Sequence, residues 1–341
     1  MMAHWLDETL SRVCLSRVAV FGDFCLDAYW EIDALVEGEE ELSVETALAV
    51  RRVRRQRYSL GGAGNVAANV SALGCGAVWA VGLVGADPFG GLLRQLLAEA
   101  GVDTAGMLTG PADWQTGVFG KPLIGGVEQN RMDFGGFNEM SEEAMGRLAA
   151  ALDEAAGGSD AVILNQQVPA GVSSPAMIER INRVVERYAG RCVFIADSRH
   201  FGELYRGVVF KTNANEALRM LGRPRAVGER VDAREAADAA GALHARTGCA
   251  VFVTRGEAGM VVADGGAVRE VPGVAISGPV DPVGAGDTAV SAIAAVLGGG
   301  GDVLTAAKFA NLAAAVTVRK LHTTGTASPA ELRAEFGDTR R

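Results

Sequence analysis

The sequence predicts an α/β fold in which a mainly parallel central sheet lies between helices, with a small β lid beside it. Short apolar runs rich in Val, Ile and Phe alternate along the chain with longer segments rich in Ala and Leu. The apolar runs are continuous, which is typical of parallel strands that are buried on both faces. Two polar segments, 30–60 and 116–134, interrupt the alternation, and we expect them to form the lid.

Each element of the main domain follows from its local pattern. The expected strands are the apolar runs 18–21, 78–81, 161–164, 193–196, 208–210 and 251–254. The expected helices are the segments 65–73, 89–100, 142–155, 175–188, 233–247, 288–297 and 303–321. Strands that alternate with helices form βαβ units, and these units build a parallel sheet.

The two lid segments differ from the rest of the chain in composition. Residues 30–60 contain an acidic run at 37–41 and a strand-like stretch at 48–58, and residues 116–134 resemble a hairpin around Gly125 and Gly126. We therefore expect the main domain to consist of 1–29, 61–115 and 135–341. A lid that closes over a ligand excludes water and completes a site.

Composition argues against several classes of protein. The 341 residues include 32 Lys and Arg against 41 Asp and Glu, and the resulting net charge of −9 argues against a nucleic-acid partner. No apolar stretch has the ~20 residues that span a bilayer, so we expect no membrane partner and a cytoplasmic location. Five cysteines without a C-x-x-C pair argue against a disulfide framework or a structural zinc site.

The strongest local signal is the turn at 281–288, which directly precedes an Ala-rich helix. Its small residues Gly284, Ala285 and Gly286 let main-chain N–H groups approach a ligand at the positive end of the helix dipole, which makes an anion site. Asp287, directly behind them, can take a proton from an attacking hydroxyl while the amides stabilise a transferring phosphoryl group. The alternative is that Asp287 only caps the helix.

A second glycine-rich turn covers residues 60–69 and also leads into a helix. Side chains such as Asn65 and Asn69 both donate and accept hydrogen bonds, which suits the hydroxyl groups of a polyol. The alternative is that Asn65 caps its helix and Asn69 faces solvent.

The glycine spacing also allows a different class of enzyme. Residues 62–67 and 284–289 both fit G-x-G-x-x-A, so each turn taken alone could belong to a dinucleotide-binding dehydrogenase. The first turn follows a polar, Arg-rich segment rather than a buried strand, and the second places an acid in the phosphate cradle. A P-loop is excluded because G-x-x-x-x-G-K-[ST] does not occur.

Together, the two turns resemble the ribokinase/PfkB family of carbohydrate kinases. Residues 281–294 match its C-terminal signature throughout, and residues 61–67, with Gly74, match its N-terminal signature. Gly85 lies one residue later than expected, which indicates a local insertion. The resemblance extends from Val18 to Leu332. It implies a ribokinase-like three-layer sandwich, ATP and Mg²⁺ as cofactors, and a sugar or sugar phosphate as the acceptor.

Within the family, the subgroup that phosphorylates a heptose 7-phosphate is the most similar. The segments that carry this similarity are 22–30, 130–134, 309–316 and 325–329. Residues 43–50 depart from the subgroup because they lack its usual prolines. No nucleotidyltransferase domain with an H-x-G-H signature follows, so we expect no second activity of that kind from this chain.

The resemblance implies roles for catalytic and substrate-binding residues. Asp287 is the expected base, and Gly284, Ala285 and Gly286 are the expected anion hole. The residues expected to bind the acceptor are Asp23, Asp27, Gly61, Gly62, Asn65 and Arg131. For Asp23, the alternative is that it caps the end of a strand.

The resemblance also implies a nucleotide site. The residues expected there are Asn213, Glu216, Thr254, Gly256 and Asn311. Glu216, in an N-x-x-E pattern, is expected to place water and Mg²⁺ near the triphosphate, and the alternative is a Glu that stabilises a helix dipole. The alternative for Asn311 is an ordinary position on a helix surface. Asp281 could bind a monovalent cation such as K⁺, or simply form a turn.

An arginine cluster in the first lid segment has two interpretations. Its members are Arg51, Arg52, Arg54, Arg55 and Arg57. Most of them are expected to form a solvated lid edge that resists strand pairing, while one or two could hold a substrate phosphate, as could Lys121 and Arg131. Relatives dimerise through the lid, so we expect a homodimer. A non-catalytic sugar-binding protein with the same fold is a third possibility.

Overall fold

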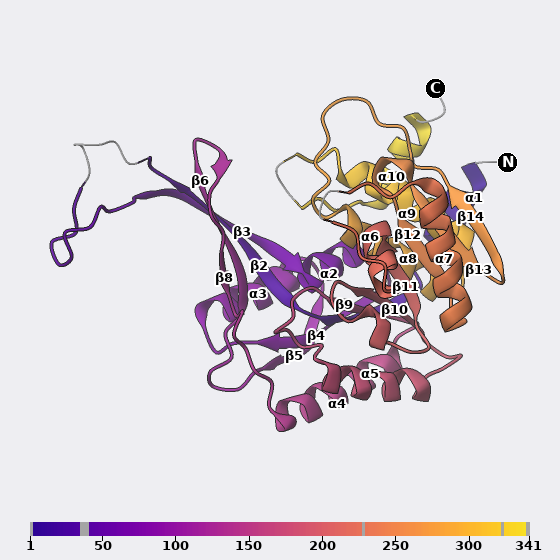
Figure 1. Ribbon diagram of the computed structural model, residues 1–341, viewed down its shortest axis with the longest axis horizontal. Helices are drawn as coiled ribbons and strands as arrows, with labels where there is room; N and C mark the ends of the chain where they lie inside the picture. The colour runs from indigo at the N-terminus through magenta and orange to yellow at the C-terminus, as the bar shows by residue number, and fades with distance from the viewer. Residues whose placement is uncertain (1–2, 35–40, 227–228, 322–323, 339–341) are drawn as a thin grey trace.

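The computed structural model describes residues 3–34, 41–226, 229–321 and 324–338, and it contains two sheets (Figure 1). The larger sheet lies between two layers of helices, and the smaller sheet projects from the main body on the left of Figure 1. The larger sheet has nine strands in the order β14-β13-β12-β11-β10-β9-β1-β4-β5 within the described residues. Its neighbouring strands are parallel from β12 to β5, and β13 and β14 are added antiparallel at one edge.

The strands of the larger sheet are β1 Arg17–Gly22, β4 Ala77–Val84, β5 Asp103–Thr109, β9 Ala161–Gln166, β10 Val193–Ser198, β11 Val209–Asn213, β12 Val251–Thr254, β13 Met260–Asp264 and β14 Ala267–Val271. The helices are α1 Ala3–Val13, α2 Ala63–Ala72, α3 Pro88–Glu99, α4 Glu142–Gly158, α5 Pro175–Arg187, α6 Ala214–Met220, α7 Ala233–Thr247, α8 Ala285–Gly298, α9 Val303–Thr317 and α10 Pro329–Asp338. None of the helices in the described part of the chain combines the length and apolarity needed to cross a bilayer.

Side-chain alternation along each strand divides the core between the two faces. In β1, Ala19 and Phe21 pack with α4 and α5 on one face, whereas Val18 and Val20 pack with α2 and α8 on the other. Both faces are apolar because helices cover both, which explains the continuous apolar runs in the sequence.

The smaller sheet corresponds to the expected lid. Its strands are β2 Phe24–Ile32, β3 Val53–Gly62, β6 Gly117–Ile124, β7 Val127–Glu128 and β8 Met132–Phe134. The order is β3-β2-β6-β7, with β8 also paired to β6. The hairpin around Gly125 and Gly126 is present, since β6 and β7 are antiparallel and Ile124 pairs with Val127. The sheet includes residues 24–29 and 61–62, which we had expected in the main domain; the division into domains stays a prediction.

Several expected boundaries are wrong by a few residues. The expected strand 48–58 is instead β3, which starts at Val53, and the expected strand 208–210 continues to Asn213. The helix expected at 303–321 ends at Thr317, and the helix expected at 288–297 begins three residues earlier, at Ala285. The acidic run at 37–41 falls mainly outside the described residues.

Candidate active site

Polar residues gather where parallel strands of the larger sheet end. Asp23 follows β1, Gln166 ends β9, Ser198 ends β10 and Asn213 ends β11. Ligands of open α/β sheets bind at the carboxyl ends of the strands, and α8 begins at this same edge.

The turn before α8 leaves amides available for an anion. Gly284 is the residue before the helix and has a φ of 83°, a left-handed conformation that favours glycine. The N–H of Ala285 donates to Pro282 O at 3.2 Å. The N–H groups of Gly286 and Asp287 make no hydrogen bond with other described residues. The anion hole that we predicted from three residues therefore offers the amides of Gly286 and Asp287, while Ala285 is already engaged.

Asp287 lies in the first turn of α8 and does not cap it, so the capping alternative is wrong. Its Oδ2 accepts a hydrogen bond from Asn65 Nδ2 at 2.7 Å. Burial raises the pKa of Asp287 to about 6, and Asp197 adds to this rise, whereas the Asn65 hydrogen bond and the positive charges of Lys211 and Arg199 oppose it. A carboxylate with a pKa near neutrality is suited to act as a general base.

A hydrogen-bond chain between α2 and α8 orients the Asp287 carboxylate. Thr288 Oγ1 donates to Asn69 Oδ1 at 2.8 Å, and Asn69 Nδ2 donates to Asn65 O at 2.9 Å. Ser291 Oγ also donates to Val66 O at 3.0 Å. Asn69 is fully buried rather than solvent-facing, and the residue that precedes α2 is Gly62 rather than Asn65, so both alternatives for these asparagines are wrong. Asn65 contacts the base and lines neither of the two cavities described next.

The first cavity, the nucleotide cleft, has a volume of about 510 Å³ and lies beside the N-terminus of α8. The predicted nucleotide residues that line it are Asn213, Glu216, Thr254, Gly256 and Asn311, together with 284–287. The structure therefore brings together five residues that span about a hundred positions of the chain. Asp281 does not line the cleft; its Oδ1 accepts a hydrogen bond from Val283 N at 3.0 Å, which is a turn contact.

Two nucleotide-cleft residues have defined local partners. Glu216 Oε2 accepts a hydrogen bond from Asn213 N at 3.0 Å, and Asn213 Oδ1 accepts one from Glu216 N at 2.9 Å, which forms a capping box at the start of α6. Asn311 is buried, and its Nδ2 donates to Val271 O and Pro272 O at 3.1 and 2.9 Å. The helix-surface alternative for Asn311 is therefore wrong.

A buried ion pair also faces this cleft. Lys211 Nζ lies 2.9 Å from Asp197 Oδ2, and the two side chains are only 6% and 7% exposed. A Cβ atom at Gly286 would lie 3.1 Å from Lys211 Nζ, so the ammonium group lies directly behind the anion hole. Burial alone would lower the pKa of Lys211, but Asp197 and Glu216 raise it above its usual value, which keeps the side chain charged.

Sequence reasoning missed both members of this pair. We ended the expected strand 208–210 at residue 210, and Lys211 follows immediately as the charge in the run Val209–Asn213. A charge inside a buried strand was the available signal, because such residues are almost never buried unless they are paired.

The second cavity, the acceptor pocket, has a volume of about 450 Å³ and lies between the lid and the strand ends. It is lined by the predicted residues Asp27, Gly62 and Arg131, and also by Lys121. Asp27 is buried, and its Oδ1 lies 2.7 Å from Lys121 Nζ. Gly61 borders the Asp27 carboxylate rather than the cavity.

Arginines of the lid have partners in the structure. Arg131 donates from Nε and Nη2 to the two carboxylate oxygens of Asp133 at 2.6 and 2.7 Å, at the rim of the acceptor pocket. In the first lid segment, Arg52 pairs with Glu41 and Arg54 pairs with Asp33. Residues 41–55 of this segment, the exposed arm, are almost all exposed. These contacts agree with a solvated lid edge for most of the cluster.

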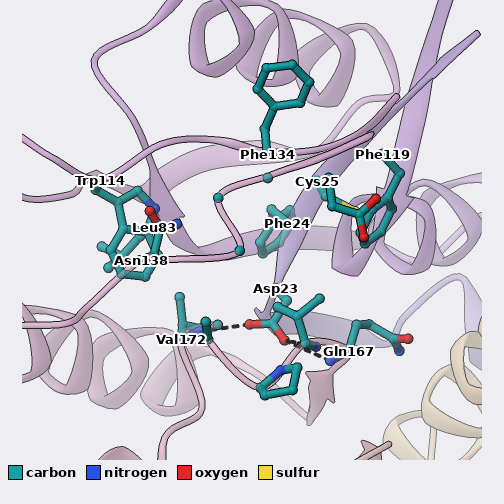
Figure 2. Close-up of a pocket in the computed structure, with 18 residues that line it drawn as sticks. Asp23, Phe24, Cys25, Leu83, Trp114, Phe119, Phe134, Asn138, Gln167 and Val172 are labelled. Carbon is teal, nitrogen blue, oxygen red and sulfur yellow. Dashed lines mark hydrogen bonds between the residues drawn. The ribbon is translucent and has the colours of Figure 1, made fainter. Parts of the chain in front are cut away.

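Asp23 does not face the acceptor pocket. Its Oδ2 accepts hydrogen bonds from Gln167 N and Val168 N at 2.7 and 3.0 Å, and its Oδ1 accepts one from Val172 N at 2.8 Å (Figure 2). With both oxygens occupied, Asp23 holds the loop 167–172, and our prediction that it binds sugar hydroxyls is not supported. This loop forms one wall of an apolar cavity of about 220 Å³, whose lining residues are drawn in Figure 2.

We expect Asp23→Asn to destabilise the protein by about 1–3 kcal/mol, because the amide NH₂ would face main-chain N–H groups that need an acceptor. Urea unfolding measures this loss, and Asp113→Asn, in an exposed turn, is the control that should change little. An unchanged stability together with weaker acceptor binding would instead assign Asp23 to the substrate.

The comparisons with known proteins agree with this geometry. The profile described as "pfkB family carbohydrate kinase" matches residues 17–119 and 197–331, which is more than half of the chain. The chain belongs to the pfkB family of carbohydrate kinases. This membership supports the kinase interpretation of the two glycine turns and not the dehydrogenase alternative.

Curated relatives of this pfkB family member include two named types. The "Bifunctional protein HldE" of Halorhodospira halophila is 36% identical over 330 residues, which cover 94% of this chain and 63% of that protein. The "D-beta-D-heptose 7-phosphate kinase" of Bordetella bronchiseptica is 31% identical over 320 residues, which cover 92% and 94% of the two chains. The chain thus spans less than two thirds of the HldE relative.

Solved structures confirm the ribokinase-like fold. Phosphofructokinase-2 from Escherichia coli in complex with fructose-6-phosphate matches with a TM-score of 0.73 at 17% identity, over 96% of this chain and 100% of that one. Ribokinase of Arabidopsis thaliana complexed with ribose and ATP matches with a TM-score of 0.71 at 19% identity, over 94% and 98%. At this identity, the likeness shows the fold alone.

Proposed function

We propose that the protein is an ATP-dependent kinase that transfers the γ-phosphoryl group to a hydroxyl of a sugar or sugar phosphate. The observation that carries this proposal is Asp287, a carboxylate with a raised pKa beside two available amides at a helix N-terminus. The nucleotide cleft and the acceptor pocket meet beside it, since both include Gln167 and Arg199.

Each residue has a separate role in an in-line transfer of the phosphoryl group. Asp287 accepts the proton of the attacking hydroxyl, whose oxygen forms a new bond to phosphorus while the bond to the ADP oxygen breaks. The amides of Gly286 and Asp287 donate to the phosphoryl oxygens. Asp27 and its partner Lys121 are placed to orient the acceptor's hydroxyl groups, and closure of the lid would exclude water.

The carboxylates of the nucleotide cleft fit a phosphate-bound Mg²⁺ rather than a protein cage. Within the described ranges, no group of three or more His, Cys, Asp or Glu side chains could enclose a metal ion. Mg²⁺ usually keeps several waters and binds substrate phosphates with one or two carboxylates. Glu216 would hold its water ligands, and the ion would neutralise charge on the triphosphate. A K⁺ site at Asp281 stays a prediction.

For the acceptor, we propose a sugar that already carries a phosphate, with a heptose 7-phosphate as the first candidate. The cations Lys121, Arg131 and Arg199 line the acceptor pocket, and the guanidinium fork of arginine matches phosphate geometry. The name of the Bordetella bronchiseptica relative supports the same substrate class.

An ADP-release assay over a panel of acceptors tests this function. The panel contains ribose, fructose 6-phosphate, heptose 7-phosphate and the heptose without phosphate, each with ATP and Mg²⁺. We expect release with heptose 7-phosphate and a much weaker rate with the unphosphorylated heptose. Binding of sugars without ADP release would favour the non-catalytic alternative, and release with plain ribose alone would reject the sugar-phosphate assignment.

We also propose a homodimer through the lid. The exposed arm carries a group of exposed large apolar side chains, Leu42, Val44, Leu48 and Val50, and a group of this kind marks an interaction surface. The mass in solution, with and without residues 33–52, tests this proposal. An ATP-dependent reaction is consistent with the predicted cytoplasmic location.

A further inference from the structure

Two residues connect the two cavities. Gln167 and Arg199 line both the nucleotide cleft and the acceptor pocket, whereas Asp287 lines the nucleotide cleft and Asp27 the acceptor pocket. A phosphoryl group that passes from one ligand to the other must therefore pass beside Gln167 and Arg199. Gln167 belongs to the loop that Asp23 holds and carries no charge, so Arg199 is the charged residue of the two.

Gln166 holds the main chain around Arg199 in place, through both its buried side chain and its main-chain carbonyl group. Gln166 is fully buried, and its O accepts a hydrogen bond from Arg199 N at 3.0 Å. Its Oε1 accepts hydrogen bonds from Ser198 Oγ and His200 N, both at 2.8 Å. The residues on both sides of Arg199 are thus tied to the end of β9, and the exposed Arg199 side chain extends from this platform.

The guanidinium of Arg199 differs from the other cations at the two cavities. Lys121 pairs with Asp27, Arg131 pairs with Asp133, and Lys211 pairs with Asp197. Arg199 is exposed and forms no ion pair with any residue in the described parts of the chain. Its charge still acts on its surroundings, since it lowers the pKa of both Asp287 and Asp197. An unpaired cation therefore lies close to the base, at the junction of the two cavities.

We propose that Arg199 is a catalytic residue that contacts the transferring phosphoryl group and bridges the nucleotide cleft and the acceptor pocket. This inference rests on the proposed kinase function. The guanidinium donates N–H groups to non-bridging oxygens of the phosphoryl group while the bond to the ADP oxygen breaks and the bond to the acceptor oxygen forms. Asp287 takes the acceptor's proton, and Arg199 exchanges none. Its charge stabilises the oxygens when they are shared between donor and acceptor.

Two other roles for Arg199 are compatible with the same position, and each predicts a different kinetic result. If it held the acceptor's own phosphate, its loss would raise the KM for the acceptor and leave kcat nearly unchanged. If it acted only through the pKa of Asp287, its loss would shift the acidic limb of the pH profile and leave the rate at high pH unchanged, because removing a nearby positive charge raises the pKa of a carboxylate.

The test compares Arg199→Ala and Arg199→Lys with the wild-type chain at about pH 8.5, where a carboxylate with a pKa near 6 is ionised in all three proteins. We expect kcat to fall by ~10²–10³-fold in Arg199→Ala and by less in Arg199→Lys, which keeps the charge without the fork. Added guanidinium ion is expected to restore part of the rate in Arg199→Ala only. Arg191→Ala is the control, because Arg191 is exposed, stacks on Tyr188 and lines neither cavity.

Nucleotide binding supplies a readout that does not need the sugar. Because the contact is to the terminal phosphoryl group, Arg199→Ala should weaken a non-hydrolysable ATP analogue several-fold relative to ADP, whose affinity should not change. This outcome would support the phosphoryl contact even if the acceptor panel failed and the proposed kinase function with it. The proposal would be overturned if the ratio of the affinities for the ATP analogue and for ADP did not change. It would also be overturned if only the acceptor KM changed, or if kcat at pH 8.5 did not change.

Discussion

Asp287→Asn is expected to lower kcat by at least ~10²-fold while ATP still binds, because general-base catalysis contributes this much to proton transfer. An amide has almost the same shape as a carboxylate, so the hydrogen bond with Asn65 and the start of α8 should persist. Steady-state kinetics measure the loss of turnover, and calorimetry with an ATP analogue measures the retained nucleotide affinity. Turnover at the wild-type rate would remove Asp287 from the mechanism.

The pH dependence gives the same prediction an independent check. Burial raises the pKa of Asp287 to about 6, so the base is protonated and inactive below that pH. We expect kcat/KM to fall about tenfold for each pH unit below the pKa, and the residual activity of Asp287→Asn to lack this limb. Because a raised pKa means that the folded state disfavours the charged form, the Asn variant should unfold at no lower temperature than wild type at neutral pH. A variant that unfolds earlier would show that its lost activity reflects misfolding.

Lys211→Met is expected to lower the free energy of unfolding by about 3–5 kcal/mol, because it leaves the Asp197 carboxylate buried without its counter-charge. Removing one member of a buried ion pair lowers stability far more than replacing both members with apolar residues, because the remaining charge is neither solvated nor compensated. Urea unfolding at neutral pH measures the loss. Arg187→Ala, which breaks the exposed pair with Asp153, is the matched control and should cost less than about 1 kcal/mol.

The double variant Asp197→Leu/Lys211→Met separates stability from function. Removing both charges should recover most of the lost stability, because an apolar pair of similar volume is often neutral in a core. Nucleotide binding should be weak in both the single and the double variant, since both lack the ammonium group beside Gly286. A double variant as unstable as the single one would indicate that packing, and not charge, is lost at this position.

The parts of the site formed by local sequence could be predicted, and the parts formed by distant contacts could not. The turn at 281–288 and the turn at 60–69 are recognisable because glycine and small residues before a helix have few other uses. The contact of Asn65 with Asp287 joins positions 222 residues apart, so no local pattern contains it. The role of Asp23 was missed for the same reason, because its three donors come from a loop about 145 residues later in the chain.

Fold prediction shows the same division. Continuous apolar runs gave the positions of six of the seven parallel strands in the described residues, because burial on both faces requires them. The seventh, β5, was missed because it lies at the edge of the sheet and is only partly buried. Strand ends were less certain, and there polar residues such as Lys211 extend β11 past its apolar run. The lid's boundaries also could not be predicted, because β2 of the small sheet starts at Phe24, two residues after β1 ends, without a change in composition there.

The hydrogen bonds from Thr288 through Asn69 to Asn65 join the two halves of the polypeptide, so they predict what happens when the polypeptide is divided into two fragments. Neither α2 nor α8 alone can orient the base, so a fragment ending before the connection at 135–140 and a fragment beginning after it would each be inactive. Phe137 in that connection is fully exposed, which makes it a suitable place to divide the chain. If two interacting proteins were fused to the fragments, phosphorylation of the sugar would report their association, and the enzyme would serve as a complementation sensor.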